Sequence, residues 1–182
     1  DAWPTMHARP FAHSSPIWIG AVGSTDPSAR AVAAADLLRA VDEAGVDFEF
    51  VSPGEVEWLE ETLDDFDLRR VLFTPNFAPR AEYEQAIAAG VRLTLDNLYP
   101  LTHWPELFEG ATLFARIDPG AGRGHHRHVQ TAGEQSKFGI PIRQVEQLAS
   151  LAAGCGARIT GLHVHAGSGI LDAGHWSEMA AV

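Results

Sequence analysis

The chain has 182 residues, and 46% of them are hydrophobic, which is enough apolar material for one ordinary core. Its 13 basic and 24 acidic side chains give a formal net charge of −11, which argues against nucleic acid or an anionic membrane as partner because nothing concentrates positive charge. A single cysteine excludes an internal disulfide. No apolar stretch approaches the roughly 18 residues of a membrane span, and the first residues lack the pattern of a secretory signal. We therefore expect a reduced, cytoplasmic protein.

Residues 1–30 differ in pattern from the rest of the chain. A short strand is predicted at 17–19, and no helical crossover is predicted before residue 31. The turn residues at 23–27 indicate a loop or the start of a helix. We treat this stretch as an atypical N-terminal segment. It could supply one further strand, or it could be unrelated to residues 31–182.

From residue 31 onward, helix-like and strand-like segments alternate. Glycines close two of the helices, at Gly45 and Gly90. Another helix begins after Ser52, which can cap it, with Pro53 in its first turn and Glu55 placed to bond back to the cap. Helices are predicted at about 31–44, from 53, at 79–89 and at 141–153, and strands at 47–51, 70–74, 91–95, 112–117 and 158–164.

Strands that alternate with helices indicate βαβ crossovers and a parallel sheet. The fold class is α/β, and the short connections suit a partial (β/α)8 TIM-type barrel better than a nucleotide-binding sheet, because the glycine-rich phosphate motifs of such sheets are absent. A complete barrel usually needs ~200–250 residues. Residues 31–182 are therefore predicted to form a partial barrel domain. The helix at 141–153 is expected to pack with a stripe of Ile142, Val145, Leu148 and Leu151.

In parallel barrels the working residues lie where strands end and in the loops after them. His163 and His165 point to the same side of one predicted strand, because side chains alternate along a strand. The turn at 166–169 exposes backbone N–H groups that suit a phosphate. Three histidines in the loop at 118–128 lack carboxylate or thiol co-ligands at a suitable spacing, so no metal site is predicted. The candidates are Ser52, Glu55, residues 74–76, Asp96, Asn97, residues 116–128 and residues 163–169.

These segments, in this order, resemble the PLP-dependent barrel of the diaminopimelate and ornithine decarboxylases, which is of the alanine-racemase type. The resemblance extends over roughly residues 36–176. The stretches at 95–101 and 122–126 are most similar to the decarboxylase half of bifunctional aspartate kinase/diaminopimelate decarboxylases. The motifs that carry the resemblance are residues 48–55, 73–76, 95–97, 114–120, 136–140 and 161–168.

The resemblance implies pyridoxal 5′-phosphate (PLP) as cofactor and a small amino acid as substrate, with meso-diaminopimelate converted to L-lysine. In that family the histidine before the Gly-Ser turn stacks on the pyridine ring, which implies His165 here. The serine of the turn, with its glycine, holds the phosphate, which implies Ser168 and Gly167. Arg116 matches an arginine close to the cofactor, although a structural salt bridge is an alternative role. Ser52 and Glu55 match pocket residues, but they could serve only as the helix cap.

The resemblance also implies parts that this sequence lacks. The family joins PLP to a lysine on its first strand, and the single lysine here, Lys137, belongs to a different motif. The expected position falls near Arg30, and arginine cannot form the imine because its guanidinium does not deprotonate. The family's later phosphate loop, its glutamate strand, its catalytic cysteine segment and its C-terminal β-domain have no counterpart in these residues. We predict that the chain as written does not decarboxylate diaminopimelate, and that its binding of PLP is weakened or lost.

Three interpretations stay open at this point. The chain could be a piece of a diaminopimelate decarboxylase, a non-catalytic homologue that acts by binding a partner or PLP, or the product of a broken reading frame. A partial barrel exposes strand edges and apolar helix faces, so we expect a homo-oligomer or an aggregation-prone fragment.

Overall fold

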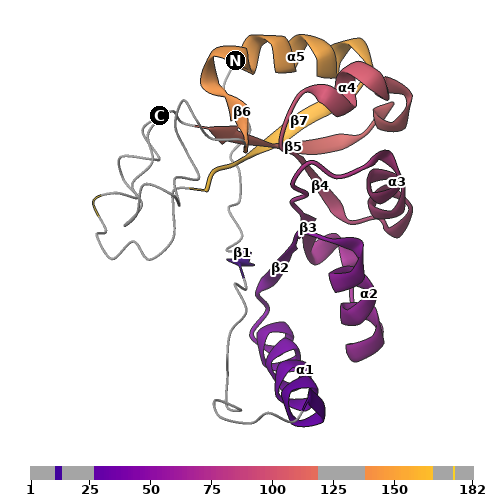
Figure 1. The fold of residues 1–182 in the computed structure, drawn as a ribbon, viewed down its shortest axis with the longest axis vertical. Coiled ribbons are helices and arrows are strands. Elements are labelled where there is room, and N and C mark those ends of the chain that lie inside the picture. The colour runs from indigo at the N-terminus through magenta and orange to yellow at the C-terminus, as the bar shows by residue number, and fades with distance from the viewer. Residues whose placement is uncertain (1–10, 14–26, 119–137, 166–173, 175–182) are drawn as a thin grey trace. The chain divides into compact units, whose positions relative to one another are not determined.

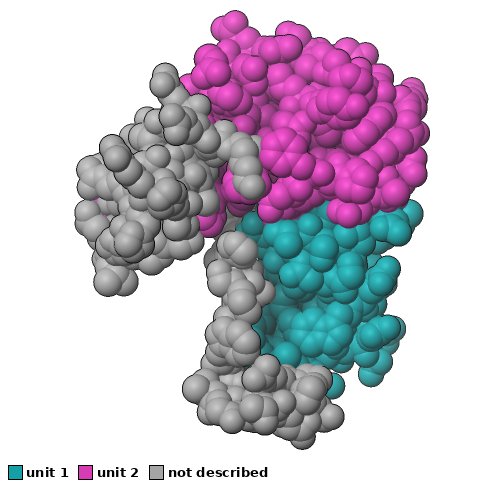
Figure 2. All heavy atoms as spheres, viewed as in Figure 1, with its two compact units in different colours: residues 1–73, 85–92 teal, residues 74–84, 93–182 magenta. Residues whose placement is uncertain are grey.

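A computed structural model describes residues 11–13, 27–118, 138–165 and 174 (Figure 1). The chain divides into two compact units, residues 1–73 with 85–92 and residues 74–84 with 93–182, which Figure 2 colours separately. Helix α3 (Arg80–Ala89) is divided between the units. Each unit is described by itself.

The first unit is built on three parallel strands. β1 (Phe11–His13) pairs with β2 (Asp47–Phe50), and β2 pairs with β3 (Val71–Phe73). Helix α1 (Pro27–Glu43) precedes β2, helix α2 (Pro53–Thr62) follows it, and a short 3-10 turn, η1 (Leu68–Arg70), leads into β3. The order β2, α2, β3 is the βαβ crossover that the sequence predicts. Helix α1 begins at Pro27, four residues before its predicted start.

The second unit is organised around β5 (Thr112–Asp118), which pairs in parallel with β4 (Arg92–Leu95), β7 (Arg158–His163) and the two-residue β6 (Ile140–Pro141). Helix α4 (Tyr99–His103) and the 3-10 turn η2 (Pro105–Phe108) connect β4 to β5. The 3-10 turn η3 (Ile142–Gln144) and helix α5 (Val145–Gly154) connect β6 to β7. A parallel α/β fold is therefore confirmed.

The start of α2 follows from its local sequence. Pro53 occupies the first turn, and one carboxylate oxygen of Glu55 accepts hydrogen bonds from the backbone N–H groups of Val51 and Ser52, at 2.9 and 3.0 Å. These donors lie at the helix start, where the helix itself offers no acceptors. Ser52 and Glu55 thus form the helix cap, which was one of the two roles considered for them.

The register of the second unit aligns one layer of side chains across three strands. Thr94, Phe114 and Gly161 are partners across β4, β5 and β7. A Cβ atom at Gly161 would lie 2.2 Å from the Phe114 ring. Glycine is therefore required there, because the aromatic ring occupies the space that any other side chain would need.

The five strands predicted after residue 31 are all present, each within one residue of the expected bounds. The predicted strand at 17–19 lies outside the described residues, whereas β1 at Phe11–His13 was not predicted. The predicted stripe on the helix at 141–153 is wrong in part. Leu148 is buried, but Ile142 and Val145 are exposed. Ile142 lies in the 3-10 turn before α5, and Val145 is the first residue of α5. Within the described residues, no helix is long and apolar enough to cross a membrane.

Candidate functional site at the carboxyl ends of the strands

Polar side chains gather where β4, β5 and β7 end in the second unit. The register pairs Leu95 with Ala115 and Arg116 with His163, so Asp96 follows β4 beside Arg116 on the neighbouring strand. Side chains alternate between faces, so Asp96, Arg116 and His163 share the face that carries the Thr94–Phe114–Gly161 layer. His165 lies two residues beyond the end of β7.

Arg116 is a buried cation, with 8% of its surface exposed. Its Nη1 donates to the side-chain oxygen of Asn76 at 2.8 Å, and its guanidinium carbon lies 5.0 Å from the centroid of the Phe138 ring. A guanidinium stays charged at any physiological pH, and an aromatic face stabilises it. These contacts with a neutral amide and an aromatic ring fix the direction of the guanidinium.

Asp96 is almost fully buried and hydrogen-bonds to both of the turns that follow β3 and β4. One oxygen accepts from the backbone N–H of Phe77 at 3.1 Å, and the other from the side-chain amide of Asn97 at 2.7 Å. Burial raises the pKa of Asp96, although these hydrogen bonds and the charge of Arg116 oppose the increase. Asp96 therefore links two turns that lie 19 residues apart in sequence.

Two hydroxyl groups near this cluster are buried without a hydrogen-bond partner in the described part of the chain, those of Tyr83 and Thr94. Tyr83 packs against Trp104 and Phe108, with ring centroids 6.0 Å away in each case. Burial, together with the negative charge of Asp96, raises the pKa of Tyr83. Its hydroxyl therefore stays protonated at physiological pH.

The structure brings together only some of the residues that the sequence proposed. Asn76, Asp96 and Arg116 meet, and His165 lies at the end of the described β7 segment, half-buried. Gly167, Ser168 and the histidine-rich loop lie outside the described residues. In the described part of the chain, no group of three potential ligands could hold a metal ion.

Sequence reasoning missed two aromatic residues of this cluster. Phe77 lies 6.2 Å from Phe138, centroid to centroid, and Phe138 supports Arg116. Phe138 belongs to a motif that carries the family resemblance, but its contact with Arg116 could not be read from spacing. Phe138 comes close to Arg116 because β6, which begins two residues after Phe138, pairs with the end of β5.

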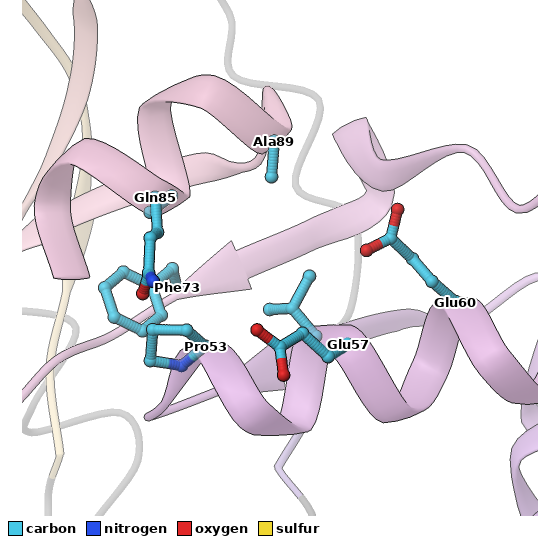
Figure 3. Close-up of a pocket in the computed structure, with 8 residues that line it drawn as sticks. Pro53, Glu57, Glu60, Phe73, Gln85 and Ala89 are labelled. Carbon is cyan, nitrogen blue, oxygen red and sulfur yellow. The ribbon is translucent and has the colours of Figure 1, made fainter. Parts of the chain in front are cut away.

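A separate groove of about 150 Å³ lies in the first unit, between α2 and α3 (Figure 3). Phe73 and Ala86 are among its lining residues, and the carboxylates of Glu57 and Glu60 lie on its α2 side (Figure 3). Negative charge at the rim disfavours an anionic ligand. The strand ends of the second unit, which hold a buried cation, are therefore the better candidate site for one.

Comparison with known proteins identifies the family. Residues 28–181 match the family described as pyridoxal-dependent decarboxylase, pyridoxal binding domain. A diaminopimelate decarboxylase of Methanothermobacter thermautotrophicus is 36% identical over 137 residues, covering 75% of this chain and 32% of that protein. A diaminopimelate decarboxylase of Streptomyces coelicolor is 27% identical over 187 residues, covering 94% of this chain and 42% of its own length.

The fold agrees with solved structures. A crystal structure of a Helicobacter pylori diaminopimelate decarboxylase variant, complexed with L-lysine, matches with a TM-score of 0.72 and 20% identity, covering 80% of this chain and 38% of that one. At this identity the match shows the fold alone. The chain spans about a third to two fifths of the length of the two curated relatives. The chain belongs to the pyridoxal-dependent decarboxylases, and its residues 28–181 match their pyridoxal-binding domain.

Proposed function

We propose that the chain is the PLP-binding part of a decarboxylase that converts meso-diaminopimelate to L-lysine. The observation that carries this proposal is the buried Arg116, held at the carboxyl ends of parallel strands on the face that carries His163. Arg116, His165, Gly167 and Ser168 are the residues that we assign to the cofactor.

The donor set of the described site fits a phosphorylated, planar cofactor. Phosphate needs a fixed cation, and Arg116 supplies one whose direction is set by Asn76 and Phe138. An imidazole offers a flat face for a pyridine ring, and His165 follows the strand that pairs with Arg116's own. A substrate carboxylate has the same charge and hydrogen-bonding requirements as a phosphate, so Arg116 could serve either anion.

Each residue then has a physical task. Arg116 binds an anionic group, His165 packs on the ring, and Ser168 with Gly167 donates hydrogen bonds to the phosphate. PLP, when bound, supplies the electron sink that decarboxylation of an amino acid requires. The single lysine of the sequence is Lys137, and we do not assign to it the role of holding the cofactor. We therefore propose that this chain alone binds PLP weakly and does not decarboxylate.

A second candidate is a non-catalytic homologue that acts by binding PLP or a protein partner. The absence of a lysine near the predicted first-strand position favours it, since the family chemistry depends on one. In either case we propose a cytoplasmic protein that associates with copies of itself. The relationship to bifunctional aspartate kinase/diaminopimelate decarboxylases stays a prediction.

The test is PLP binding by this chain, followed by borohydride reduction, intact mass and peptide mapping. We expect reversible binding without a fixed adduct. Arg116→Gln should weaken PLP affinity at least about tenfold, because it removes a charge-assisted contact. Arg158→Gln, on the exposed start of β7, is the matched control and should leave affinity unchanged.

Two results would contradict the proposal. One is an absence of PLP binding by the unmodified chain, and the other is equal affinity in the Arg116→Gln variant. An adduct that maps to Lys137 would overturn the assignment of weak, non-covalent binding.

A further inference from the structure

The turn after β3 contains a residue in an unfavourable backbone conformation. Phe77 has φ = 53°, in the left-handed region, which a bulky side chain rarely enters. The residue is 59% exposed. Burial of the ring therefore does not explain the conformation, and something else must hold the backbone there.

The side chain of Asp96 provides that restraint. Its Oδ2 accepts the Phe77 N–H at 3.1 Å, and its Oδ1 accepts from Asn97 at 2.7 Å. Asn97 in turn accepts the N–H of Tyr99 at 2.8 Å, which anchors it at the start of α4. A carboxyl group that is 1% exposed is costly to bury. These hydrogen bonds offset part of that cost, and they tie the turn after β3 to the end of β4.

The same turn supplies contacts that surround Arg116. Asn76, immediately before Phe77, accepts the hydrogen bond from Arg116 Nη1 at 2.8 Å. The Phe77 ring packs against Phe138, over which the guanidinium lies. Two contacts on the guanidinium thus depend, directly or through Phe138, on the conformation of a turn that Asp96 holds.

We propose that Asp96 is a positioning residue for Arg116, acting through the Phe77 backbone and Asn76. Loss of the Asp96 carboxyl group lets Phe77 leave the left-handed region. The Asn76 amide then rotates away, and the guanidinium loses its hydrogen bond to Asn76. Its effect on the cofactor rests on the proposed function, whereas the hydrogen-bonded path from Asp96 to Arg116 does not.

The test separates positioning from simple structural support by a rescue. In the full chain, Asp96→Ala should speed hydrogen exchange of the Phe77 amide at least about tenfold. It should also speed exchange of the Arg116 guanidinium protons, measured by NMR. PLP affinity should fall about tenfold, as when an outer partner of a binding group is removed. Phe77→Gly should then rescue Asp96→Ala, since glycine enters the left-handed region without strain.

In the double variant, guanidinium exchange and PLP affinity should return to within about twofold of Phe77→Gly alone. If Asp96 only supported the fold, Phe77→Gly would not restore guanidinium exchange or PLP affinity in the Asp96→Ala chain. Thr94→Val is the matched control, because Thr94 is equally buried on β4 and its hydroxyl has no hydrogen-bond partner in the described residues. It should leave guanidinium exchange unchanged.

Asp96→Ser replaces Asp96→Ala if the latter does not fold, because serine is too short to reach the Phe77 amide. The proposal is overturned if the folded variant keeps the exchange rate of the Arg116 guanidinium, or if the double variant behaves as Asp96→Ala does. If the unmodified chain binds no PLP, the proposed function fails, and the exchange measurements still decide the role of Asp96.

Discussion

The two units each bury a carboxyl group at the end of a strand, and they treat it differently. Asp47, at the amino end of β2, lies between two arginines, with Arg92 Nη2 at 2.7 Å and Arg70 Nε at 3.4 Å. Arg70 also pairs with Asp42 and donates to the Val46 carbonyl at 2.9 Å. Asp96, at the carboxyl end of β4, receives its hydrogen bonds from a backbone N–H and a neutral amide.

This difference separates a stabilising cluster from a candidate binding cluster. In the first unit, two arginines and two aspartates neutralise one another at the amino ends of the strands. In the second unit, Asn76, a neutral amide, accepts a hydrogen bond from Arg116, and the charge of Arg116 lowers the pKa of the neighbouring Asp96 against the effect of burial. A buried arginine at the carboxyl ends of parallel strands lies where barrels of this type place their binding sites.

The largest expected effect is a loss of stability when the buried Asp47 cluster of the first unit is disrupted. Asp47→Ala leaves Arg70 and Arg92 partly buried without their shared carboxylate, which should lower the free energy of unfolding by about 2–4 kcal/mol. Denaturant unfolding measures it. Asp36→Ala, which removes only the exposed pair with Arg39, is the control and should change little. Equal effects of the two substitutions would show that the buried cluster does not stabilise the first unit.

A smaller effect is expected in the layer beneath Arg116. Gly161→Ala places a methyl group in the space of the Phe114 ring, which should cost about 1–3 kcal/mol of stability. Thermal unfolding measures the loss, and Phe114→Leu in the same chain should recover part of it.

Gly54→Ala is the matched control for that change. Gly54 lies in α2 with nothing near its missing Cβ. Alanine there should be neutral or slightly stabilising. If Gly161→Ala were as harmless as Gly54→Ala, the layer of Thr94, Phe114 and Gly161 would be loosely packed.

The smallest expected effect is a pH dependence that belongs to Asp96. Because burial raises its pKa in the folded state, the folded chain binds this proton more tightly than the unfolded chain. Ionised Asp96 lowers the free energy of unfolding by its full amount at pH values above the raised pKa. This loss of stability disappears as the pH falls towards the ordinary pKa of aspartate. Stability of the parent chain relative to Asp96→Asn should therefore increase as the pH is lowered from 7 towards the ordinary pKa of an aspartate, about 4.

Denaturant unfolding of the parent, Asp96→Asn and Thr94→Val chains at each pH measures this dependence. Thr94→Val carries no titrating change at residue 96, so its difference from the parent should be flat with pH. A parent chain that instead loses stability relative to Asp96→Asn on acidification would show that the hydrogen bonds to Asp96 outweigh its burial.

Local features were predicted well from the sequence because local interactions decide them. The start of α2 at Pro53 follows from Ser52 and Glu55, whose hydrogen bonds span only a few residues. The five predicted strands are present because each carries its own pattern of apolar residues. The 3-10 turn at Ile142 was not predicted, because the helical spacing of apolar residues at 142–151 continues through it. Strand β6 was not predicted either, because it forms by pairing with β5, more than 20 residues earlier in the chain.

The sequence by itself determined the parallel α/β class, the family and the strand ends at which polar residues would gather. Only the tertiary structure decided that Asn76 reaches Arg116 across 40 residues, that Asp96 holds Phe77 in a left-handed conformation, and that Phe138 lies beneath the guanidinium. The physical reason is that strand patterns are encoded within each segment. The partners of a buried charge depend instead on strand register and on where each crossover returns the chain.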